Sequence, residues 1–562
     1  MSSEMALYWL NRNNPFMTDQ EIYLTTNNSE PPSESVAAIY DNELFKKGLL
    51  LRNGDNLKRY LGESSDTTAI YLYNKIQSLK AEREQYRTQS YSDSIVRELT
   101  REIDNKERAL YKLSGTYKEQ MNYDNITWHD ICSNLQENEV AVEFVNYGYI
   151  DQYFALVLRK GYEYPKLVRL PDFTNKPQEE KDKLMEFYQQ NLEFAREHNF
   201  KTMSQEPHFL EFVGDAGEIY KYEGNGTELY NALWLPLKEY INEGETVYFS
   251  PAGVLHQLSV ETLPITDAEV LADRYDLRRI SSTREIVKQS TPVENISSTI
   301  LYGGIVYDVD KDLMEAESRS YKFDNTLAVR STYDDGFDRG SASYLPGTKK
   351  EIDDISQMLK NKKIRHQLFT ADKANEESFK ALSGKHQDVL HIATHGFFWS
   401  DSIARSQKYF SQRDASLETQ PQYIDPLTRC GLLFAGANLA LRGHSNALSN
   451  GVQDGILTAK EISLLDMRDT KLVVLSACET GKGEITGDGV FGLQRAFKQA
   501  GVETIIMSLW KVNDTATQMM MSKFYEFLLS GQDKRTAFYN AQKEIRKKYP
   551  SPYYWAGFIM LD

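Results

Sequence analysis

Residues 471–481 of this chain read KLVVLSACETG, which joins an apolar run to small residues, a cysteine and a glycine. The apolar run 472–475 is half β-branched, which is typical of a strand buried on both faces of a sheet. Small residues lead to Cys478, and Gly481 permits a sharp turn. Beyond it, residues 487–501 carry apolar side chains at helical spacing. These are Val490, Leu493, Ala496 and Phe497. The pattern predicts strand, turn and helix, with a cysteine at the strand end where open α/β sheets bind ligands.

A second stretch repeats this design. Residues 388–393, DVLHIA, predict a buried strand, and Thr394, His395 and Gly396 follow it. If the two strands are neighbours, His395 meets Cys478 and can take its proton, because a thiol of ordinary pKa, about 8.5, is mostly protonated at neutral pH. The backbone N–H groups of Gly396 and Cys478 would then face the oxyanion of an acyl intermediate.

Several long motifs in order carry a family resemblance. The segments HIATHGFF, LLFAGANLAL, DGILTAKEIS, VVLSACETG and SLWKVND, with PYYWAGFIML at the end, resemble the CHAT domain of the caspase–separase clan of cysteine proteases. The resemblance covers roughly the last half of the chain. It implies a caspase-like fold, with His395 as general base and Cys478 as nucleophile.

Composition limits the classes of function. With 562 residues there is room for two to four domains, and the net charge of −16 argues against direct nucleic-acid binding, which needs a basic face. No apolar run approaches the roughly 18 residues of a membrane span. The start of the chain lacks the pattern of a secretion signal. Three cysteines make a disulfide framework improbable, so we expect a cytoplasmic protein without membrane contact.

The chain divides by pattern into four parts. Residues 1–32 are expected to form a tail, and residues 33–122 a helical hairpin or the end of a helical region, without a 34-residue repeat. Residues 123–295 predict a mixed α/β block. Residues 296–562 alternate strands and helices, which predicts a mostly parallel sheet flanked by helices.

The block 123–295 resembles the front half of CHAT proteins through YFSPAGVLHQLSVETLP. The resemblance implies an inactive protease-like subdomain that supports the catalytic domain of residues 296–562. His256 lies in this motif without an accompanying nucleophile, so we assign it a supporting role.

Three local features of the catalytic block complete its outline. Residues 307–344 and 400–426 predict polar connections, and Arg405 and Arg413 in the second suggest self-cleavage. Thr348-x-x-Glu351 predicts a capping box at a helix start.

His391 competes with His395 as the base. His391 lies inside the predicted strand 388–393, which favours a packed, hydrogen-bonded histidine. A tetrahedral zinc site needs three or four ligands. For a site built on His391 and His395 the only obvious third ligand is Cys478, so we discount zinc binding. For Cys478 itself the alternative is a buried structural thiol, which the turn, the histidine and the motifs argue against.

Asp514 is the clearest clue to specificity. In similar motifs of separase, the matching aspartate contacts a P1 arginine, where a carboxylate accepts a bidentate guanidinium. Asp514 also suits the N-cap of a helix from residue 515, and the two roles are compatible. Further candidates for substrate binding are Trp510, although a tryptophan in this position is more often part of a core, and Asp488 and Glu479. Asp488 would equally favour a helix N-terminus, and Glu479 is similarly ambiguous.

The sequence therefore predicts a cysteine endopeptidase that needs no metal or cofactor. The resemblance implies a dedicated protein substrate in a bacterial defence or stress pathway, with gasdermin-like proteins among the candidates. An activating partner is expected on a separate ground, because the polar connections 307–344 and 400–426 could cover the groove until a partner binds. The alternative is a catalytically silent or partner-gated signalling scaffold on the same fold. A nucleotide switch is not supported, because GEITGDG after Cys478 lacks the lysine and Ser/Thr of a P-loop.

Overall fold

The computed structural model describes the chain from residue 31 onward, with gaps. The described ranges are 31–47, 67–87, 93–113, 126–147, 152–170, 210–213, 219–222, 227–266, 269–287, 296–323, 340–399, 426–444, 447–449, 451–477, 480–481, 483–486, 489–510 and 512–562. The expected tail, residues 1–32, lies almost wholly outside them.

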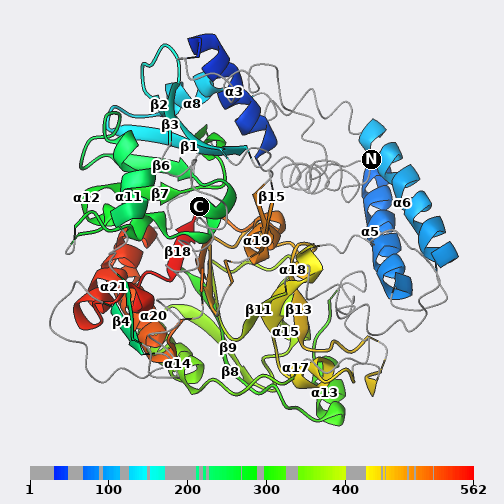
Figure 1. Ribbon diagram of the computed structural model, residues 1–562. Coiled ribbons are helices and arrows are strands. Elements are labelled where there is room, and N and C mark those ends of the chain that lie inside the picture. The colour runs from blue at the N-terminus through cyan, green and yellow to red at the C-terminus, as the bar shows by residue number, and fades with distance from the viewer. Residues whose placement is uncertain are drawn as a thin grey trace.

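One eleven-stranded sheet runs through both halves in the order β3-β2-β1-β6-β7-β18-β17-β14-β10-β8-β9 (Figure 1). Its first-half strands are β1 (Glu139–Tyr147), β2 (Gln152–Arg159), β3 (Lys166–Arg169), β6 (Thr246–Ser250) and β7 (Asp276–Arg279). Its second-half strands are β8 (Ser298–Ile305), β9 (Arg365–Ala371), β10 (Val389–Ala393), β14 (Leu472–Ser476), β17 (Thr504–Ser508) and β18 (Phe558–Leu561). Most neighbours are parallel; β1 with β2, β2 with β3 and β17 with β18 are antiparallel. The predicted α/β fold with a mostly parallel sheet is confirmed.

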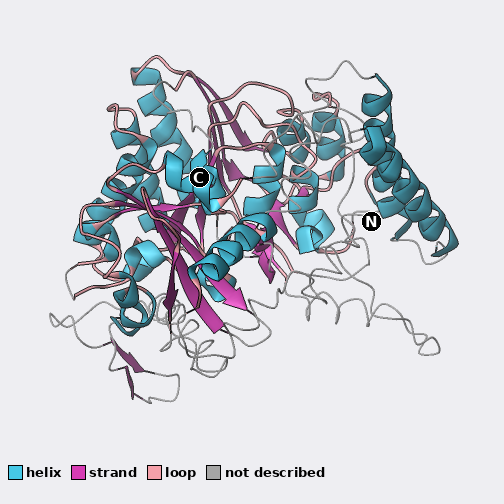
Figure 2. Ribbon diagram, turned by 90° about the horizontal axis from the view of Figure 1, so that it is seen from above, coloured by secondary structure: helices cyan, strands magenta, loops and turns pink. Residues whose placement is uncertain are grey.

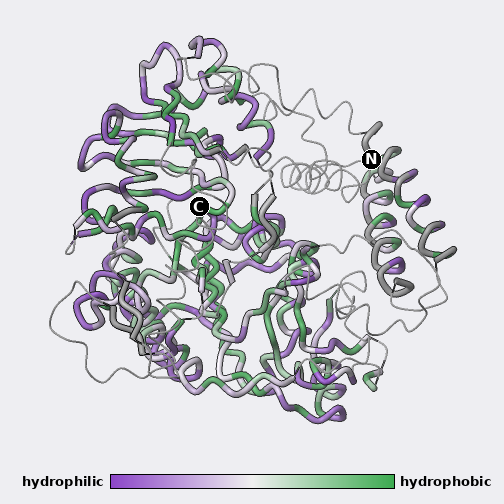
Figure 3. The backbone as a smooth tube through the Cα atoms, viewed as in Figure 1, coloured by the Kyte–Doolittle hydropathy of each residue, from purple (hydrophilic) through white to green (hydrophobic). Residues whose placement is uncertain are grey.

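Helices cover both faces of the second-half strands (Figures 1 and 2). One face carries α14 (Pro346–Asn361), α20 (Asp514–Leu528) and α21 (Lys534–Lys548). The opposite face carries α15 (Glu376–Lys380), α18 (Ala459–Ile462) and α19 (Leu493–Ala500). Strands buried on both sides account for the continuous apolar runs in the sequence, and hydrophobic residues are concentrated along them (Figure 3).

The remaining elements form small sheets and short helices. The small sheets consist of β11 (Gly396–Phe398), β12 (Cys430–Leu433) and β13 (Ile456–Thr458); β15 (Gly483–Thr486) and β16 (Gly489–Gly492); and β4 (Leu210–Val213) and β5 (Ile219–Tyr222). The short helices are α8 (Trp128–Asn134), α11 (Thr227–Leu233), α12 (Leu271–Arg274), α13 (Lys311–Ser318), α17 (Ala437–Leu441) and the 3₁₀ turn η3 (Gly253–Gln257). No helix in the described part of the chain is long and apolar enough to cross a membrane.

The two halves meet where β7 lies beside β18. Leu561 pairs with Arg279, and the Asp562 N–H donates to the Arg279 carbonyl at 3.2 Å. Helix α21 strengthens this junction, since Arg546 reaches Asp273 at 2.6 Å. The division into blocks 123–295 and 296–562 stays a prediction, because the sheet is continuous across it.

In the described part of the chain, helices α3, α5 and α6 come before α8 and the first strand of the sheet. Helices α5 (Thr67–Arg87) and α6 (Asp93–Leu113) lie side by side and bury their own apolar contact, which includes Ile76, Leu79 and Ile103 (Figure 1). Helix α3 (Ser33–Lys46) instead packs on the first half of the sheet.

Lys47, directly after α3, fixes that helix to the sheet. Its ammonium lies 2.5 Å from the Glu143 carboxylate and donates to the Phe144 carbonyl at 2.7 Å and the Ser250 hydroxyl at 2.9 Å. The other Glu143 oxygen accepts from the Thr283 N–H at 2.8 Å. Both ionic side chains are buried, with 6% and 0% exposed, so each charge depends on the other.

The capping box expected at Thr348 and Glu351 is wrong. Helix α14 begins earlier, with Pro346 in its first turn. The Thr348 hydroxyl donates to the Leu345 carbonyl and accepts from the Gly304 N–H of β8. Glu351 is buried against the sheet, so tertiary contacts take both side chains away from the helix end.

The helix expected from residue 487 begins only at Leu493. Val490 instead belongs to β16, which forms a hairpin with β15. Glycines 487, 489 and 492 explain the difference, since glycine is a poor helix former. The expected polar connection 307–344 also contains the helix α13, while most of 400–426 lies outside the described residues.

Lys47→Met is expected to destabilise the protein by about 3–5 kcal/mol, because Glu143 would keep a buried charge without its partner. Urea denaturation followed by circular dichroism measures the change. Lys350→Met, which removes an exposed pair with Asp354, should cost less than about 1 kcal/mol. An equal loss of unfolding free energy in the two variants would contradict a stabilising role for the buried Lys47–Glu143 pair.

Candidate active site

Two adjacent parallel strands end at the same edge of the sheet, and each is followed by one residue of the predicted dyad. Strands β10 and β14 pair in register from Val389 with Leu472 to Ala393 with Ser476. His395 is the second residue after Ala393, and Cys478 is the second residue after Ser476. Because parallel strands in register end at one edge, both residues follow the same edge of the sheet. Cys478 and Glu479 themselves lie outside the described residues, which reach Ala477 on this side.

The imidazole of His395 is held by a backbone carbonyl. Its Nε2 lies 2.8 Å from the Ser343 carbonyl oxygen, and a carbonyl can only accept. Nε2 therefore carries the proton, which assigns the basic lone pair to Nδ1. The ring also packs against Tyr307 with 5.1 Å between ring centroids, and the Tyr307 hydroxyl lies 2.9 Å from the Thr394 hydroxyl. The histidine is thus fixed in both tautomer and direction.

Burial lowers the pKa of His395 below its usual value of 6.5. The hydrogen bond to Ser343 and the negative charge of Asp514 oppose this effect by favouring the protonated ring. The net shift keeps the imidazole neutral at neutral pH, which is the form that can accept a proton.

Asp514 is exposed and close enough to His395 to affect its charge. It does not cap α20, because the N-cap is Asn513, whose side chain accepts from the Ala516 N–H at 3.0 Å. Asp514 instead accepts from the Gly347 N–H at 3.0 Å, at the start of α14. A Cβ at Gly347 would lie 2.2 Å from the Asp514 carboxylate, so a larger residue at this position would displace that carboxylate.

The backbone N–H of Gly396, the first residue of β11, is directed away from the neighbouring strand β12. Strand β11 pairs with β12, with Gly396 opposite Leu432. The Leu433 N–H donates to the His395 carbonyl and the Trp399 N–H donates to the Arg429 carbonyl. Because hydrogen-bonded and non-hydrogen-bonded pairs alternate, Gly396 belongs to a pair of the second kind. Its N–H is therefore directed away from β12, as an oxyanion donor requires.

Of the other residues predicted to bind substrate, one is buried and two lie outside the described residues. Trp510 is only 1% exposed, and its indole N–H lies 3.4 Å from the Tyr553 carbonyl oxygen, which favours the core interpretation over a pocket wall. Asp488 and Glu479 lie outside the described residues, as do Arg405 and Arg413.

His391 has the packed environment that its strand predicts. Its ring is fully buried, and its Nε2 lies 2.8 Å from a carboxylate oxygen of Glu351. The Ser476 hydroxyl donates to the other Glu351 oxygen at 3.1 Å. Sequence reasoning missed Glu351 as a site residue, although a histidine in the middle of a buried strand signals that a polar partner must exist.

His256 lies in η3, at the carboxyl edge of the first-half strands. Burial, together with the positive charges of Lys47 and Arg279, lowers its pKa to about 3, so the ring stays neutral at neutral pH. The turn η3 packs beside the β15–β16 hairpin, which follows Cys478 in the chain.

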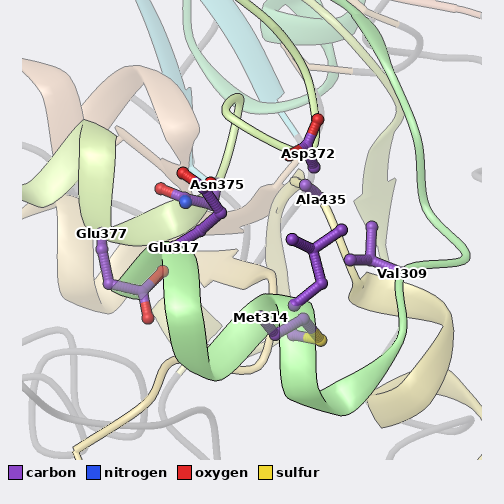
Figure 4. Close-up of a pocket in the computed structure, with 8 residues that line it drawn as sticks. Val309, Met314, Glu317, Asp372, Asn375, Glu377 and Ala435 are labelled. Atoms are coloured by element: carbon purple, nitrogen blue, oxygen red, sulfur yellow. The ribbon is translucent and has the colours of Figure 1, made fainter. Parts of the chain in front are cut away.

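A small recess with acidic and apolar walls lies near the carboxyl ends of β8 and β9 (Figure 4). Its lining includes Val309, Met314, Glu317, Asp372, Asn375, Glu377 and Ala435. It holds no histidine or cysteine, so it does not contain the predicted dyad. Among the described ranges, no three His, Cys, Asp or Glu side chains are grouped as a metal site would need.

Comparisons with known proteins give partial matches. Tetratricopeptide repeat protein 28 of Homo sapiens is 36% identical over 112 residues, which are 20% of this chain and 4% of that protein. The structure of the Saccharomyces cerevisiae separase–securin complex matches with 11% identity and a TM-score of 0.38, covering 77% of this chain and 30% of that one. The Arg-specific cysteine proteinase gingipain R matches with 8% identity and a TM-score of 0.33, covering 68% of this chain and 74% of that one.

The chain thus spans only a small part of the length of the first two proteins. The family model named CHAT domain, by contrast, matches residues 223–561, which is more than half of the chain. The matched range contains strands β10 and β14, which lead to His395 and Cys478, and also the turn η3 of the first half. The chain therefore belongs to the CHAT-domain family, as its motifs indicated.

Proposed function

We propose that this protein is a cysteine endopeptidase with Cys478 as nucleophile and His395 as general base. The observation that carries the proposal is the in-register pairing of β10 with β14, each followed two residues later by one member of the dyad. The tautomer of His395 supports it, because the Ser343 carbonyl takes the Nε2 proton and leaves Nδ1 to act as the base.

The reaction follows from these groups. The Cys478 thiol gives its proton to His395 Nδ1, and the thiolate attacks the scissile carbonyl carbon. The N–H groups of Gly396 and Cys478 stabilise the oxyanion. When the C–N bond breaks, the amine leaves with the proton from His395, and a thioester remains. His395 then takes a proton from water, the hydroxide attacks the thioester, and the acid is released as Cys478 recovers its proton.

The substrate is an extended peptide that crosses the carboxyl edge of the sheet. Strand β11 lies at the edge of its three-stranded sheet, and the Gly396 N–H is directed away from β12. A peptide can pair with such an edge by β-augmentation, which brings its carbonyl to this donor. No metal or organic cofactor enters the scheme.

Asp514 gives the site a preference for a basic P1 residue. Its carboxylate is exposed and acts on the charge of His395, so a P1 guanidinium near the dyad would have a partner. Glu479 and Asp488, which follow Cys478 in the sequence, are further acidic candidates for contact with a basic substrate. Trp510, being buried, contributes to the core beneath this region.

The biological role that we propose is cleavage of a dedicated protein substrate in a bacterial defence or stress pathway, in the cytoplasm. The family resemblance suggests gasdermin-like proteins as candidate substrates. An activating protein is the further partner that we propose, one that uncovers the groove from the polar connections 307–344 and 400–426. The alternative is a silent or partner-gated scaffold. Peptide cleavage and labelling of Cys478 distinguish this alternative from an active protease.

The native protein is expected to cleave fluorogenic peptides that have Arg or Lys at P1. The Cys478→Ala variant should lose this cleavage, and the Asp514→Ala variant should lose the preference for a basic P1 residue. Peptides with Leu, Met and Asp at P1 complete the panel. Cleavage after Leu or Met would contradict the role of Asp514 but keep the protease. If no peptide is cleaved, labelling by a peptidyl acyloxymethyl ketone separates a gated protease, which is labelled at Cys478, from a silent scaffold.

The pKa of His395 is expected to lie below 6.5 in the Cys478→Ala variant, because burial disfavours the charged ring. Asp514→Asn should lower it further, since the carboxylate charge that favours protonation is removed. Titration of the imidazole signals by NMR measures both values. Asp353→Asn, an exposed aspartate of α14 paired with Lys349, is the control and should leave the value unchanged. An increase with Asp514→Asn would contradict the geometry.

Self-cleavage after Arg405 or Arg413 is expected if the preference for basic residues is correct. Purified native protein should then yield two fragments on a denaturing gel, and Cys478→Ala should remain intact. Arg405→Gln/Arg413→Gln should prevent the cut while peptide cleavage persists. Identical intact chains for the native and Cys478→Ala forms would exclude self-cleavage.

A further inference from the structure

A buried carboxylate joins the two strands that lead to the dyad. Glu351 of α14 is 1% exposed and lies on the face of the sheet that α14 covers. One of its oxygens lies 2.8 Å from Nε2 of His391 on β10, and the other accepts from the Ser476 hydroxyl of β14 at 3.1 Å. A single side chain thus spans neighbouring strands.

The positions of the two contacts matter for the site. His391 lies four residues before His395, and Ser476 lies two residues before Cys478. Both contacts are therefore close to the point where the backbone leaves the sheet and enters the loops of the dyad. A shift of either strand end here would change the distance between the base and the nucleophile.

The partners of Glu351 are themselves fixed. The Tyr525 hydroxyl of α20 lies 3.3 Å from Nδ1 of His391, so the ring has a polar contact on both nitrogens. Burial, and secondarily the charge of Glu351, raises the pKa of Tyr525 well above its usual value, which keeps the hydroxyl protonated and able to donate. All four groups are buried, so each is costly to leave without its hydrogen bond.

The helix that carries Glu351 also contacts the site at its beginning. Ser343, whose carbonyl holds His395, lies three residues before Pro346, the first residue of α14. The Gly347 N–H donates to Asp514, and Thr348 contacts β8 through the Gly304 N–H. Glu351 is thus the inner contact of a helix that already touches the base and the acidic residue beside it.

We propose that Glu351 is a positioning residue that holds the ends of β10 and β14 in the arrangement that keeps His395 within reach of Cys478. Its role depends on geometry, through its bonds to His391 and Ser476, and its negative charge is not required. The inference rests on the proposed function, because it assumes that the two residues act together.

The test compares three variants with different lengths and charges at position 351. Glu351→Gln keeps the length and can accept from one partner and donate to the other, so it should keep most of the native activity. Glu351→Asp keeps the charge but withdraws it by about 1.5 Å, and Glu351→Ala removes the contact. Both should lower kcat by about 10- to 100-fold with little change in KM, since the dyad loses its alignment.

A second readout does not depend on peptide cleavage. The rate of Cys478 alkylation by iodoacetamide, followed by mass spectrometry of its peptide, reports the help that His395 gives to the thiol. The rate should fall in His395→Ala, in Glu351→Ala and in Glu351→Asp, and stay near native in Glu351→Gln.

A matched control corrects for lost stability. Glu261 is also buried and bonds Arg279 of β7, which is four strands from β10, or roughly 19 Å. Glu261→Ala should lower the melting temperature as Glu351→Ala does, without slowing alkylation.

The outcomes separate the two proposals. If His395→Ala leaves alkylation of native Cys478 unchanged, the dyad and the proposed function fall together with this inference. If His395→Ala slows alkylation but Glu351→Ala does not, only the role of Glu351 is overturned. A Glu351→Gln variant as slow as Glu351→Ala would overturn the geometric role in favour of the charge.

Discussion

The parallel, in-register pairing of β10 with β14 is the constraint on which the rest of the site depends. Parallel hydrogen bonds fix Ala393 beside Ser476, and from there each chain needs only two residues to reach its predicted catalytic group. Main-chain geometry alone thus brings the ends of two strands that are far apart in the sequence to one edge of the sheet.

Buried polar side chains then connect this strand pair to the surrounding helices. The first two turns of α14 contact β8, β10, β14 and α20 through Thr348, Glu351 and the Gly347 N–H. Buried polar groups are costly unless they are paired, so such contacts restrict the possible arrangements more strongly than apolar packing does. Lys47 has a similar effect in the first half, where it fixes α3 to the end of β6.

The continuity of the sheet explains why a first half without a predicted dyad accompanies the second. Strand β18 lies between β7 and β17, so the last strand of the chain completes the sheet of both halves. The turn η3 packs beside the β15–β16 hairpin, which follows Cys478. The first half is therefore in contact with the hairpin that follows Cys478 in the sequence.

The buried strands, the fold class and the family could be predicted from the sequence, because buried parallel strands leave continuous apolar runs and the motifs around His395 and Cys478 are long. It also placed His391 in the core, since a histidine within such a run has little access to water. Local pattern failed where long-range contacts compete with it. Thr348 and Glu351 match a capping box, yet both are taken by β8, β10 and β14, and Asn513 rather than Asp514 caps α20. Helical spacing around Val490 likewise gave way to a glycine-rich hairpin. The pairing of a buried carboxylate with particular strands came from the tertiary fold, because the two side chains that meet, such as Glu351 and Ser476, are 125 residues apart in the sequence.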